Sequence, residues 1–337
     1  MTVVPLKAEA PTSAIESSQL AAYCKAAGDP LRLEILRVLR YNAFGVLELS
    51  QIFDIGQSGM SHHLKVLAKS GLVATRREGN SIFYRRAPAQ EGPGGEAFQR
   101  ALYSAIDQLT LPTDIEQRIH AVNLERTAAS RAFFEQNAER FRINQDLIAS
   151  FDQYGEAITE LLDNTPGARR QVLEVGPGEG GFLPALASRF QQVIALDTSA
   201  EMLDRARVVV DGQQLNNVEL CHGDTELALT QDTRADCITL NMVLHHTPDP
   251  AQIFADLAQL LLPGGALLVT ELCHHDQSWT RESCGDLWLG FDPEDLSQWA
   301  TAVGLREGES LFLAQRNGFQ IQLRQFFKPT AATPDRR

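Results

Sequence analysis

The chain has 337 residues, which exceeds one typical domain and favours two. Its 44% hydrophobic and 22% charged residues are those of an ordinary globular protein, and no apolar run is long enough to span a membrane. The first residues lack a basic start followed by an apolar core, so we expect no secretory signal. Five scattered cysteines, an odd number, favour reduced thiols in a cytoplasm over a disulfide framework.

The net charge of −13 is unevenly spread along the chain. Residues 1–95 hold 11 Lys and Arg against 8 Asp and Glu, so they carry +3 and the remainder carries −16. Within residues 55–86, six basic residues accompany a single acidic one. This pattern indicates a small module that meets phosphates, attached to a body that does not. The alternative is that the basic residues only form a solvated face.

The first predicted domain covers residues 14–90. Asp29 and Pro30 predict a helix start as N-cap and first helical residue, and the run LRLEILRVLR follows. Two further helices are predicted for VLELSQIFDI and QSGMSHHLKVLAKSG, the second ended by Gly71. The runs LVATRRE and SIFYRRA, joined by Gly79-Asn80, predict a β-hairpin. A helix pair followed by a hairpin indicates an α+β winged helix-turn-helix domain.

Three segments of this domain, KAAGDPLRLEILRVL, QSGMSHHLKVLAKSGLV and RREGNSIFYRR, resemble the ArsR/SmtB family of bacterial regulators. The resemblance implies that the helix from about Gln57 to Lys69 is the recognition helix and that the hairpin is the wing. Short polar side chains near the helix start suit base edges and phosphates, and wing arginines can reach the flanking backbone. The predicted DNA-binding residues are Gln57, Ser58, Ser61, His62, Lys65, Arg76, Arg77 and Arg85. We therefore expect a homodimer on an inverted repeat of double-stranded DNA.

Many members of that family sense metals through paired cysteines in the helix before the recognition helix. This chain has Val46, Leu47, Glu48 and Leu49 there, and Cys24 stands alone. A thiolate metal site needs several ligands. We therefore expect that the protein needs no tightly bound transition metal, and we set aside its interpretation as a metal sensor.

Residues 91–165 are predicted to connect the two domains. GPGG at 92–95 indicates a flexible break, and FQRALYSAIDQL reads as an amphipathic helix, which forms the dimer interface in relatives. Thr113 and Glu116 form a capping box that predicts the start of a long helix. Phe133 and Phe134 are expected to pack against the second domain, with a position over the ligand as the alternative.

The second predicted domain covers residues 166–330 and begins with QVLEVGPGEGGF, a strand and a glycine-rich turn. Gly176, Gly178 and Gly180 let the backbone pass close to a ligand. Gly176, Gly178 and Gly181 also satisfy the dinucleotide fingerprint. A second strand ends in Asp197, where a carboxylate would accept hydrogen bonds from ribose hydroxyls. Both NAD and S-adenosylmethionine fit these residues.

Three later segments decide between the two ligands, because they resemble successive motifs of class I S-adenosylmethionine-dependent methyltransferases. They are NVELC with the following Gly223-Asp224, then ADCITLNMVLHHTPDP, and then LLLPGGALLVTE. The runs SLFLAQ and FQIQLRQFF flank Asn317-Gly318 and predict an antiparallel hairpin. The expected fold is α/β and doubly wound (Rossmann-like), closed by this C-terminal hairpin.

The resemblance implies roles for eight residues at an S-adenosylmethionine or S-adenosylhomocysteine site. Glu174 would lie near the amino group of the ligand's methionine part, and the three glycines would line that part. Asp197 would bind the ribose, and Asp224 with Thr225 would bind the adenine. The residues are Glu174, Gly176, Gly178, Gly180, Asp197, Asp224, Thr225 and Asn241, the last beside the methyl-bearing sulfur. The alternative for Asp224 is a turn residue that caps the next segment.

The segment HHDQSWTRESCGDLWLGF is interpreted as a lid over the ligand or acceptor. His245 and His246 either serve an acceptor or cap the strand end. Cys273 and Cys284 suggest an arsenite methyltransferase, but its additional cysteines are absent and isolated cysteines are often inert.

The fusion as a whole resembles the bacterial regulators of methionine metabolism that respond to S-adenosylhomocysteine. We expect a cytoplasmic DNA-binding regulator, a repressor, whose second domain binds S-adenosylmethionine or S-adenosylhomocysteine as effector. The alternative is an active small-molecule methyltransferase with an autoregulatory DNA-binding domain, because methyl transfer depends mainly on alignment and needs no catalytic triad.

Overall fold

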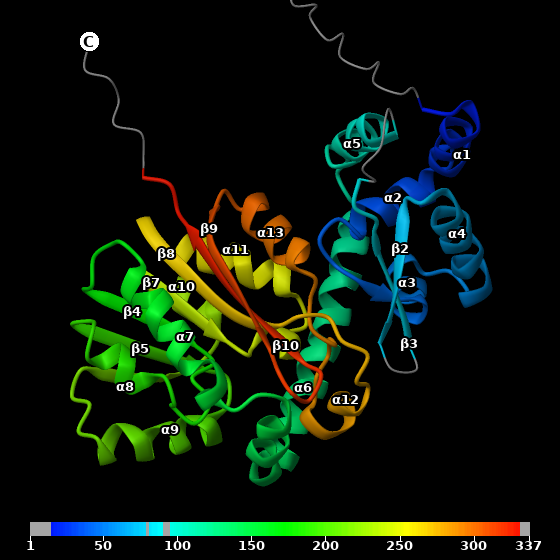
Figure 1. Cartoon of the computed structure of the whole chain (residues 1–337). Helices are drawn as coiled ribbons and strands as arrows, with labels where there is room; N and C mark the ends of the chain where they lie inside the picture. The colour runs from blue at the N-terminus through cyan, green and yellow to red at the C-terminus, as the bar shows by residue number, and fades with distance from the viewer. Residues whose placement is uncertain (1–14, 79–80, 90–94, 331–337) are drawn as a thin grey trace, which may run out of the picture. The chain divides into compact units, whose positions relative to one another are not determined.

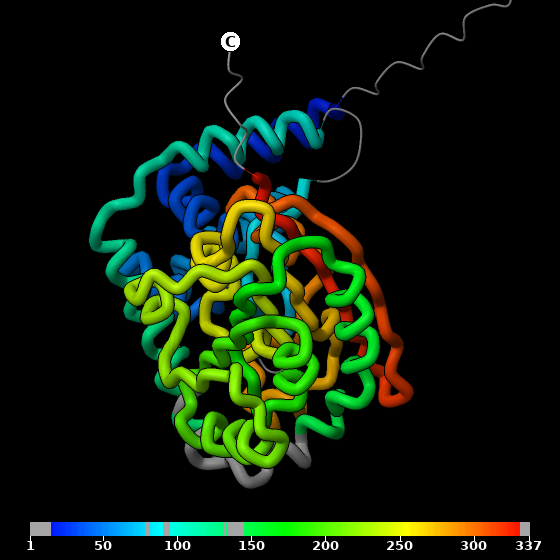
Figure 2. The backbone as a smooth tube through the Cα atoms, turned by 90° about the vertical axis from the view of Figure 1, so that its left-hand side faces the viewer, coloured from blue at the N-terminus to red at the C-terminus, as the bar shows by residue number. Residues whose placement is uncertain are grey.

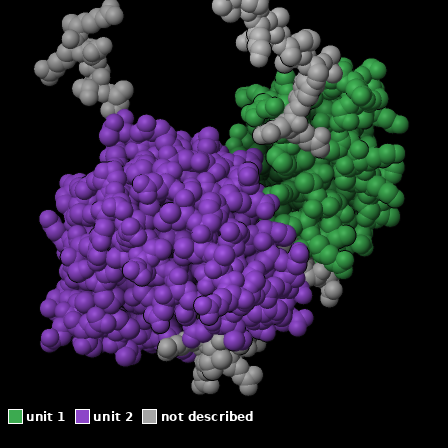
Figure 3. Space-filling view, viewed as in Figure 1, with its two compact units in different colours: residues 1–122 green, residues 123–337 purple. Residues whose placement is uncertain are grey.

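The computed structural model describes residues 15–78, 81–89 and 95–330. It divides into two compact units, Met1–Val122 and Asn123–Arg337, which Figure 3 colours separately. The boundary falls inside the segment predicted as a connector. The predicted turn at Gly79-Asn80, the break at 92–94 and the side chain of Phe134 lie outside the described residues.

Unit 1 is a winged helix-turn-helix, as predicted. Its helices are α1 (Ser17–Ala27), α2 (Pro30–Val38), α3 (Val46–Phe53), α4 (Gln57–Ser70) and α5 (Gly95–Ile106). The strands β1 (Phe44–Gly45), β2 (Val73–Glu78) and β3 (Ser81–Arg86) form an antiparallel sheet in the order β1-β3-β2. Helices α3 and α4 make the helix-turn-helix, and β2 with β3 makes the wing (Figure 1).

Local signals set the helix ends of unit 1. The Asp29 side chain accepts from the Arg32 N–H at 3.1 Å and caps α2, with Pro30 at its first position. Helix α4 ends at Gly71, whose φ of 79° is left-handed, and the Leu72 N–H donates to the Leu67 carbonyl at 3.1 Å. The apolar side of α4 is fully buried, at Met60, Leu64 and Leu67. The polar side of the same helix is therefore left at the surface.

Helix α6 (Thr113–Ile148) belongs to both units. Ile115 and Val122 are buried in the core of unit 1. From Asn123 onwards the same helix is part of unit 2.

Unit 2 is built on a seven-stranded sheet in the order β6-β5-β4-β7-β8-β10-β9. The strands are β4 (Gln171–Val175), β5 (Gln192–Asp197), β6 (Val218–His222), β7 (Ala235–Asn241), β8 (Leu261–Leu272), β9 (Arg306–Ala314) and β10 (Gln320–Phe327). Strands β4 to β8 are parallel, and β10 runs antiparallel to both β8 and β9. This is the predicted doubly wound sheet with an antiparallel C-terminal hairpin.

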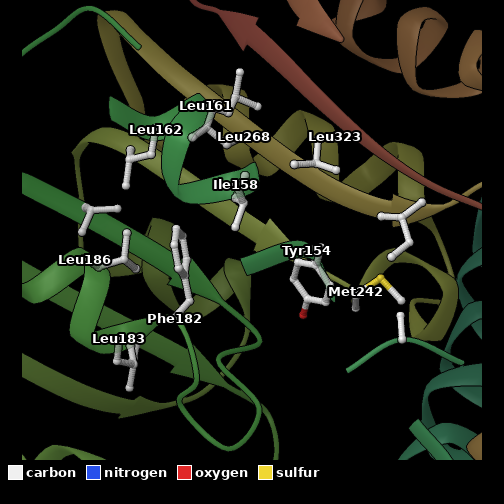
Figure 4. Close-up of a cluster of buried hydrophobic side chains, with 14 of the residues drawn as sticks. Tyr154, Ile158, Leu161, Leu162, Phe182, Leu183, Leu186, Met242, Leu268 and Leu323 are labelled. Carbon is white, nitrogen blue, oxygen red and sulfur yellow. The ribbon is translucent and has the colours of Figure 1, made fainter. Parts of the chain in front are cut away.

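Helices cover both faces of this sheet (Figures 1 and 2). They are α7 (Phe151–Asn164), α8 (Leu183–Ala187), α9 (Ala200–Gly212), α10 (Thr225–Thr230), α11 (Pro250–Leu260), α12 (Trp279–Cys284), α13 (Pro293–Ala302) and the 3-10 helix η1 (Leu244–His246). Isoleucine and leucine side chains of α7 and α8 belong to one buried cluster with Leu268 of β8 and Leu323 of β10, part of which Figure 4 shows. On the other face, Phe254 of α11 contacts the rings of Trp299 and Phe326.

Candidate functional site

The order of the strands places a topological switch point at the carboxyl ends of β4 and β7. Strand β5 follows β4 on one side and β7 lies on its other side, so the winding direction reverses there. Ligands of open α/β sheets bind outside such a switch point. Glu174 on β4 and Asn241 at the end of β7 are the predicted residues nearest to this reversal.

The glycine-rich turn follows β4 directly. Gly176 has a φ of 69°, and a Cβ there would lie 2.5 Å from Val243 Cγ2, so only glycine fits. Gly178 has a φ of 55°, but its nearest neighbour, Met202 Cε, is 4.0 Å from an added Cβ. Gly180 packs against Ala206 of α9, at 3.2 Å from its Cα. The space beside the turn is therefore at Gly178, whereas Gly180 is required for helix packing.

Glu174 and Asn241 form a buried polar pair at the switch point. The Asn241 amide donates to Glu174 Oε1 at 3.3 Å. Glu174 Oε2 and Asn241 Oδ1 have no hydrogen-bond partner among the described residues. Burial raises the pKa of Glu174 to about 8, although the Asn241 amide opposes this shift. Glu174 Oε2 and Asn241 Oδ1 therefore keep unused hydrogen-bonding capacity, so the pair is suited to a ligand that brings N–H groups.

Asp197 closes β5 beside the glycine-rich turn. Its Oδ1 accepts from the Ser199 N–H at 2.9 Å. Burial raises the pKa of Asp197 to about 6, while backbone N–H groups of Ser199 and Gly178 and the nearby His222 ring lower it. A carboxylate has about four acceptor positions, so capacity remains for the predicted ribose hydroxyls.

The predicted adenine residues have structural partners of their own. Asp224 is exposed and caps α10, because its Oδ1 accepts from the Leu227 N–H at 2.9 Å. The capping alternative is therefore observed. Thr225 is buried and its hydroxyl donates to Asp256 Oδ2 at 2.5 Å. Because the Thr225 hydroxyl is already bonded to Asp256, the predicted contact with adenine would have to come from the backbone of Thr225.

The predicted DNA-binding residues lie on two elements of unit 1. Five are exposed on α4, at Gln57, Ser58, Ser61, His62 and Lys65. On the wing, Arg77 is exposed while Arg76 and Arg85 are half-buried.

Arg86 contributes less to the basic surface than its sequence position indicates. Its Nη1 is paired with Asp107 Oδ1 at 2.9 Å, and its Nη2 donates to the Leu36 carbonyl at 2.6 Å. Burial lowers the pKa of Arg86, although Asp107 opposes the shift. Of the six basic residues between positions 55 and 86, Arg86 therefore serves a structural ion pair inside unit 1.

The segment interpreted as a lid is packed into unit 2. Asp286, Trp288 and Phe291 are buried, and Trp288 Nε1 donates to the Thr247 carbonyl at 2.8 Å. Burial raises the pKa of Cys273 to about 11 and that of Cys284 to about 12, which disfavours the thiolate that binds arsenic. These pKa shifts add no support to the arsenite methyltransferase interpretation.

Sequence reasoning did not single out Glu271 or Asp286, which meet His245 and His246 in the interior of unit 2. His245 Nδ1 lies 2.6 Å from Glu271 Oε1. His246 Nδ1 lies 3.7 Å from Asp286 Oδ1. The available sequence signal was Glu271, a charged residue near the end of the apolar run in VTEL. It points to a site only once its contact with His245 is known.

Comparison with known proteins places both units in families. Residues 145–322, more than half of the chain, match a family described as a methyltransferase domain, and residues 27–76 match a helix-turn-helix domain. The chain belongs to the methyltransferase-domain family. It joins a helix-turn-helix DNA-binding domain to that methyltransferase domain, as predicted.

Curated relatives match parts of the chain. An uncharacterized 37.1 kDa transposon protein of Streptomyces fradiae is 35% identical over 37% of this chain and 37% of its own length. The ubiquinone biosynthesis O-methyltransferase of Coxiella burnetii is 31% identical over 41% of this chain and 64% of its own length. The demethylmenaquinone methyltransferase of Bacillus cereus is 26% identical over 46% of this chain and 62% of its own. The chain thus spans less than two thirds of each of these relatives.

Two methyltransferases are among the solved structures that resemble this chain. The N-methyltransferase NodS of Bradyrhizobium japonicum, solved with S-adenosyl-L-homocysteine, is 20% identical and covers 56% of this chain and 98% of its own, with a TM-score of 0.45. An O-methyltransferase family protein from Burkholderia thailandensis is 16% identical and covers 94% of this chain and 96% of its own, with a TM-score of 0.46. No helix of the described residues has the length and apolar character needed to cross a membrane.

Proposed function

We propose that this protein is a DNA-binding transcriptional repressor of the ArsR type. Its methyltransferase domain would bind S-adenosylhomocysteine or S-adenosylmethionine as an effector. The polar face of α4 and the wing would hold one half-site, and a homodimer would hold an inverted repeat. Glu174, Asn241 and Asp197 would hold the methionine and ribose parts of the ligand.

One observation carries the effector role: α6 contacts the segment that follows the ligand site. Val243 lies against the glycine-rich turn at Gly176, and η1 begins at the next residue. Ser130 of α6 donates to the His246 carbonyl at 3.4 Å. Arg126 donates to the Pro248 carbonyl at 3.1 Å.

Because α6 also supplies Ile115 and Val122 to the core of unit 1, one helix takes part in both units. A ligand that changes the packing at Gly176 can thereby bias the position of α6. It can shift the DNA-binding equilibrium only by the difference between its affinities for the two arrangements.

The second candidate is an active methyltransferase that regulates its own operon. It is favoured by the names of the relatives from Coxiella burnetii and Bacillus cereus, which are methyltransferases of quinone biosynthesis. The acceptor would then be a small molecule bound beside Asn241.

The deciding experiment measures operator affinity as a function of ligand. A duplex selected from a random pool would be titrated with the protein, with and without S-adenosylhomocysteine or S-adenosylmethionine. A coupling of 1–3 kcal/mol corresponds to roughly 5- to 150-fold in operator affinity. The Asp197→Ala variant, which loses hydrogen bonds to the ribose worth about 1.5–3 kcal/mol each, should bind DNA normally but lose the response.

Release of S-adenosylhomocysteine from S-adenosylmethionine in the presence of a demethylated quinol would support the second candidate. If operator affinity is unchanged by either ligand although both bind, the effector role is wrong. Wild-type protein that binds neither ligand in calorimetry would contradict both candidates.

A further inference from the structure

Four ionisable side chains meet in the interior of unit 2, close to the end of β7, where Asn241 pairs with Thr270 of β8. His245 and His246 are the last residues of η1, Glu271 lies near the end of β8, and Asp286 follows α12. His245, Glu271 and Asp286 are almost fully buried. The fold therefore keeps two carboxyl groups and two imidazoles out of water, which is costly unless they serve one another or a bound ion.

Glu271 determines how His245 is oriented. Its Oε1 lies 2.6 Å from His245 Nδ1, and its Oε2 accepts from the His245 backbone N–H at 3.2 Å. Nδ1 therefore faces Glu271, and in the neutral ring a proton on Nδ1 would leave the lone pair on Nε2. This Nε2 is buried without a hydrogen-bond partner among the described residues, 3.9 Å from Asp286 Oδ1.

Asp286 and His246 complete the cluster. The Asp286 carboxylate faces both histidines, with His246 Nδ1 at 3.7 Å. The two imidazole rings lie 4.0 Å apart between centroids. One ligand atom from each of His245, His246 and Asp286 can be chosen so that all lie within 4.8 Å of one another.

We propose that His245, His246 and Asp286 bind a divalent transition-metal ion, with Glu271 as the carboxylate that orients His245. Two imidazoles and one carboxylate are a donor set that suits zinc or ferrous iron. Donors about 2.0–2.2 Å from a tetrahedral ion are roughly 3.3 Å apart. The two histidine–Asp286 separations of 3.9 and 3.7 Å would have to shorten by about half an ångström, and the separation between the two histidine nitrogens, which is within 4.8 Å, by up to about 1.5 Å. A metal-bound histidine usually donates its other ring N–H to a carboxylate, as His245 does.

The sequence analysis singled out His245 and His246 as acceptor or capping residues, but it expected no bound metal because unit 1 lacks paired cysteines. The location also suggests what the ion would do. The His246 carbonyl accepts from Ser130 of α6, and the ring of Phe133 of α6 would lie 2.3 Å from a Cβ at Gly285. An ion on η1 and Asp286 would hold both segments against α6. This inference does not depend on the effector role.

The test uses the full-length chain without an affinity tag. Protein purified without chelator would be analysed for metals, then stripped and titrated with Zn²⁺ and with Co²⁺ as a spectroscopic probe. We expect one ion per chain and visible Co²⁺ absorption bands. Asp286→Asn and His246→Gln should weaken binding at least about tenfold, and Glu271→Gln by roughly 10- to 100-fold. His120→Ala, an exposed histidine of α6, should leave affinity unchanged.

Two results would overturn the proposal. The first is wild-type protein that binds neither ion stoichiometrically, in which case protonated His245 balances the carboxylates alone. The second is Asp286→Asn protein that binds as tightly as wild type. Should the variants fail to fold, X-ray absorption of zinc-loaded wild type decides: two imidazole ligands without sulfur support the site, and a sulfur ligand excludes it.

Discussion

Burial raises the pKa of the Glu174 carboxyl group, and the proposed ligand would lower it again. Its pKa is raised from 4.5 to about 8, so the carboxyl is mostly protonated at neutral pH without ligand. An ammonium group bound beside it would favour the carboxylate and lower this pKa. Binding should therefore release a proton from Glu174, and the apparent affinity should rise with pH up to about 8.

Calorimetry in buffers of different ionisation enthalpy measures this release. We expect up to one proton per S-adenosylhomocysteine at about pH 7, below the range in which a free α-amino group titrates. Glu174→Gln protein should bind more weakly and release none. Binding without proton release in the wild type would mean that the ammonium lies elsewhere.

Individual residues also show how far a sequence can be interpreted. Asp29 and Gly71 were predicted correctly, because caps and left-handed helix ends depend on residues a few positions away. The partners of Arg86, Thr225 and Asp286 are 21, 31 and 41 residues away along the chain. No local pattern specifies such partners, so the sequence could not separate a structural arginine from a DNA-binding one.

The wing carries one arginine of each kind, so the difference between a DNA-binding and a structural arginine can be measured there. Arg77 is exposed on β2, whereas Arg86 on β3 is paired with Asp107. Arg77→Ala should lower operator affinity and flatten the salt dependence by about 0.9 in log–log slope, because one phosphate contact is lost. Its stability to urea should fall less than that of Arg86→Ala.

Arg86→Ala is the matched comparison. It should destabilise unit 1 by roughly 1–3 kcal/mol, because it leaves the Leu36 carbonyl and Asp107 without their donor. Urea denaturation and a salt titration of operator binding check both variants. Equal salt slopes for wild type and Arg77→Ala would show that Arg77 does not contact the phosphates.

The elements of unit 2 show which features distinguish a dinucleotide-binding fold from an S-adenosylmethionine-binding fold. A strand, a glycine-rich turn and an acidic strand end occur in dinucleotide and S-adenosylmethionine folds alike. The difference lies in sheet order, because β10 lies between β8 and β9 and runs antiparallel to both. The sequence predicted that hairpin from Asn317-Gly318, whereas strand order depends on long-range pairing and had to come from resemblance.

At the scale of the whole molecule, the contacts of helix α6 are the feature that could not be predicted from the sequence. The sequence predicted a long helix after Thr113, and the structure shows one ending at Ile148. Its contacts with η1 could not be predicted, because residues such as Arg126 and Pro248 are 122 positions apart. If the effector role is correct, this helix should determine how strongly ligand and DNA influence each other.

Arg126 is the side chain with which to test that coupling. Besides its bond to the Pro248 carbonyl, its guanidinium lies 5.0 Å from the ring centre of Trp288. It belongs to neither the predicted ligand residues nor the DNA-binding residues. Arg126→Ala should therefore keep both separate affinities within a few-fold of wild type. The factor by which S-adenosylhomocysteine changes operator affinity should move toward one.

Thr127→Ala, at the exposed neighbouring position, is the control and should couple as the wild type does. In the wild type, operator DNA must change the affinity for S-adenosylhomocysteine by the same factor as the ligand changes the affinity for DNA. Both factors should shrink together in Arg126→Ala, because one equilibrium between two arrangements underlies them. If Arg126→Ala retains the full factor, coupling does not depend on this contact between α6 and the η1 segment.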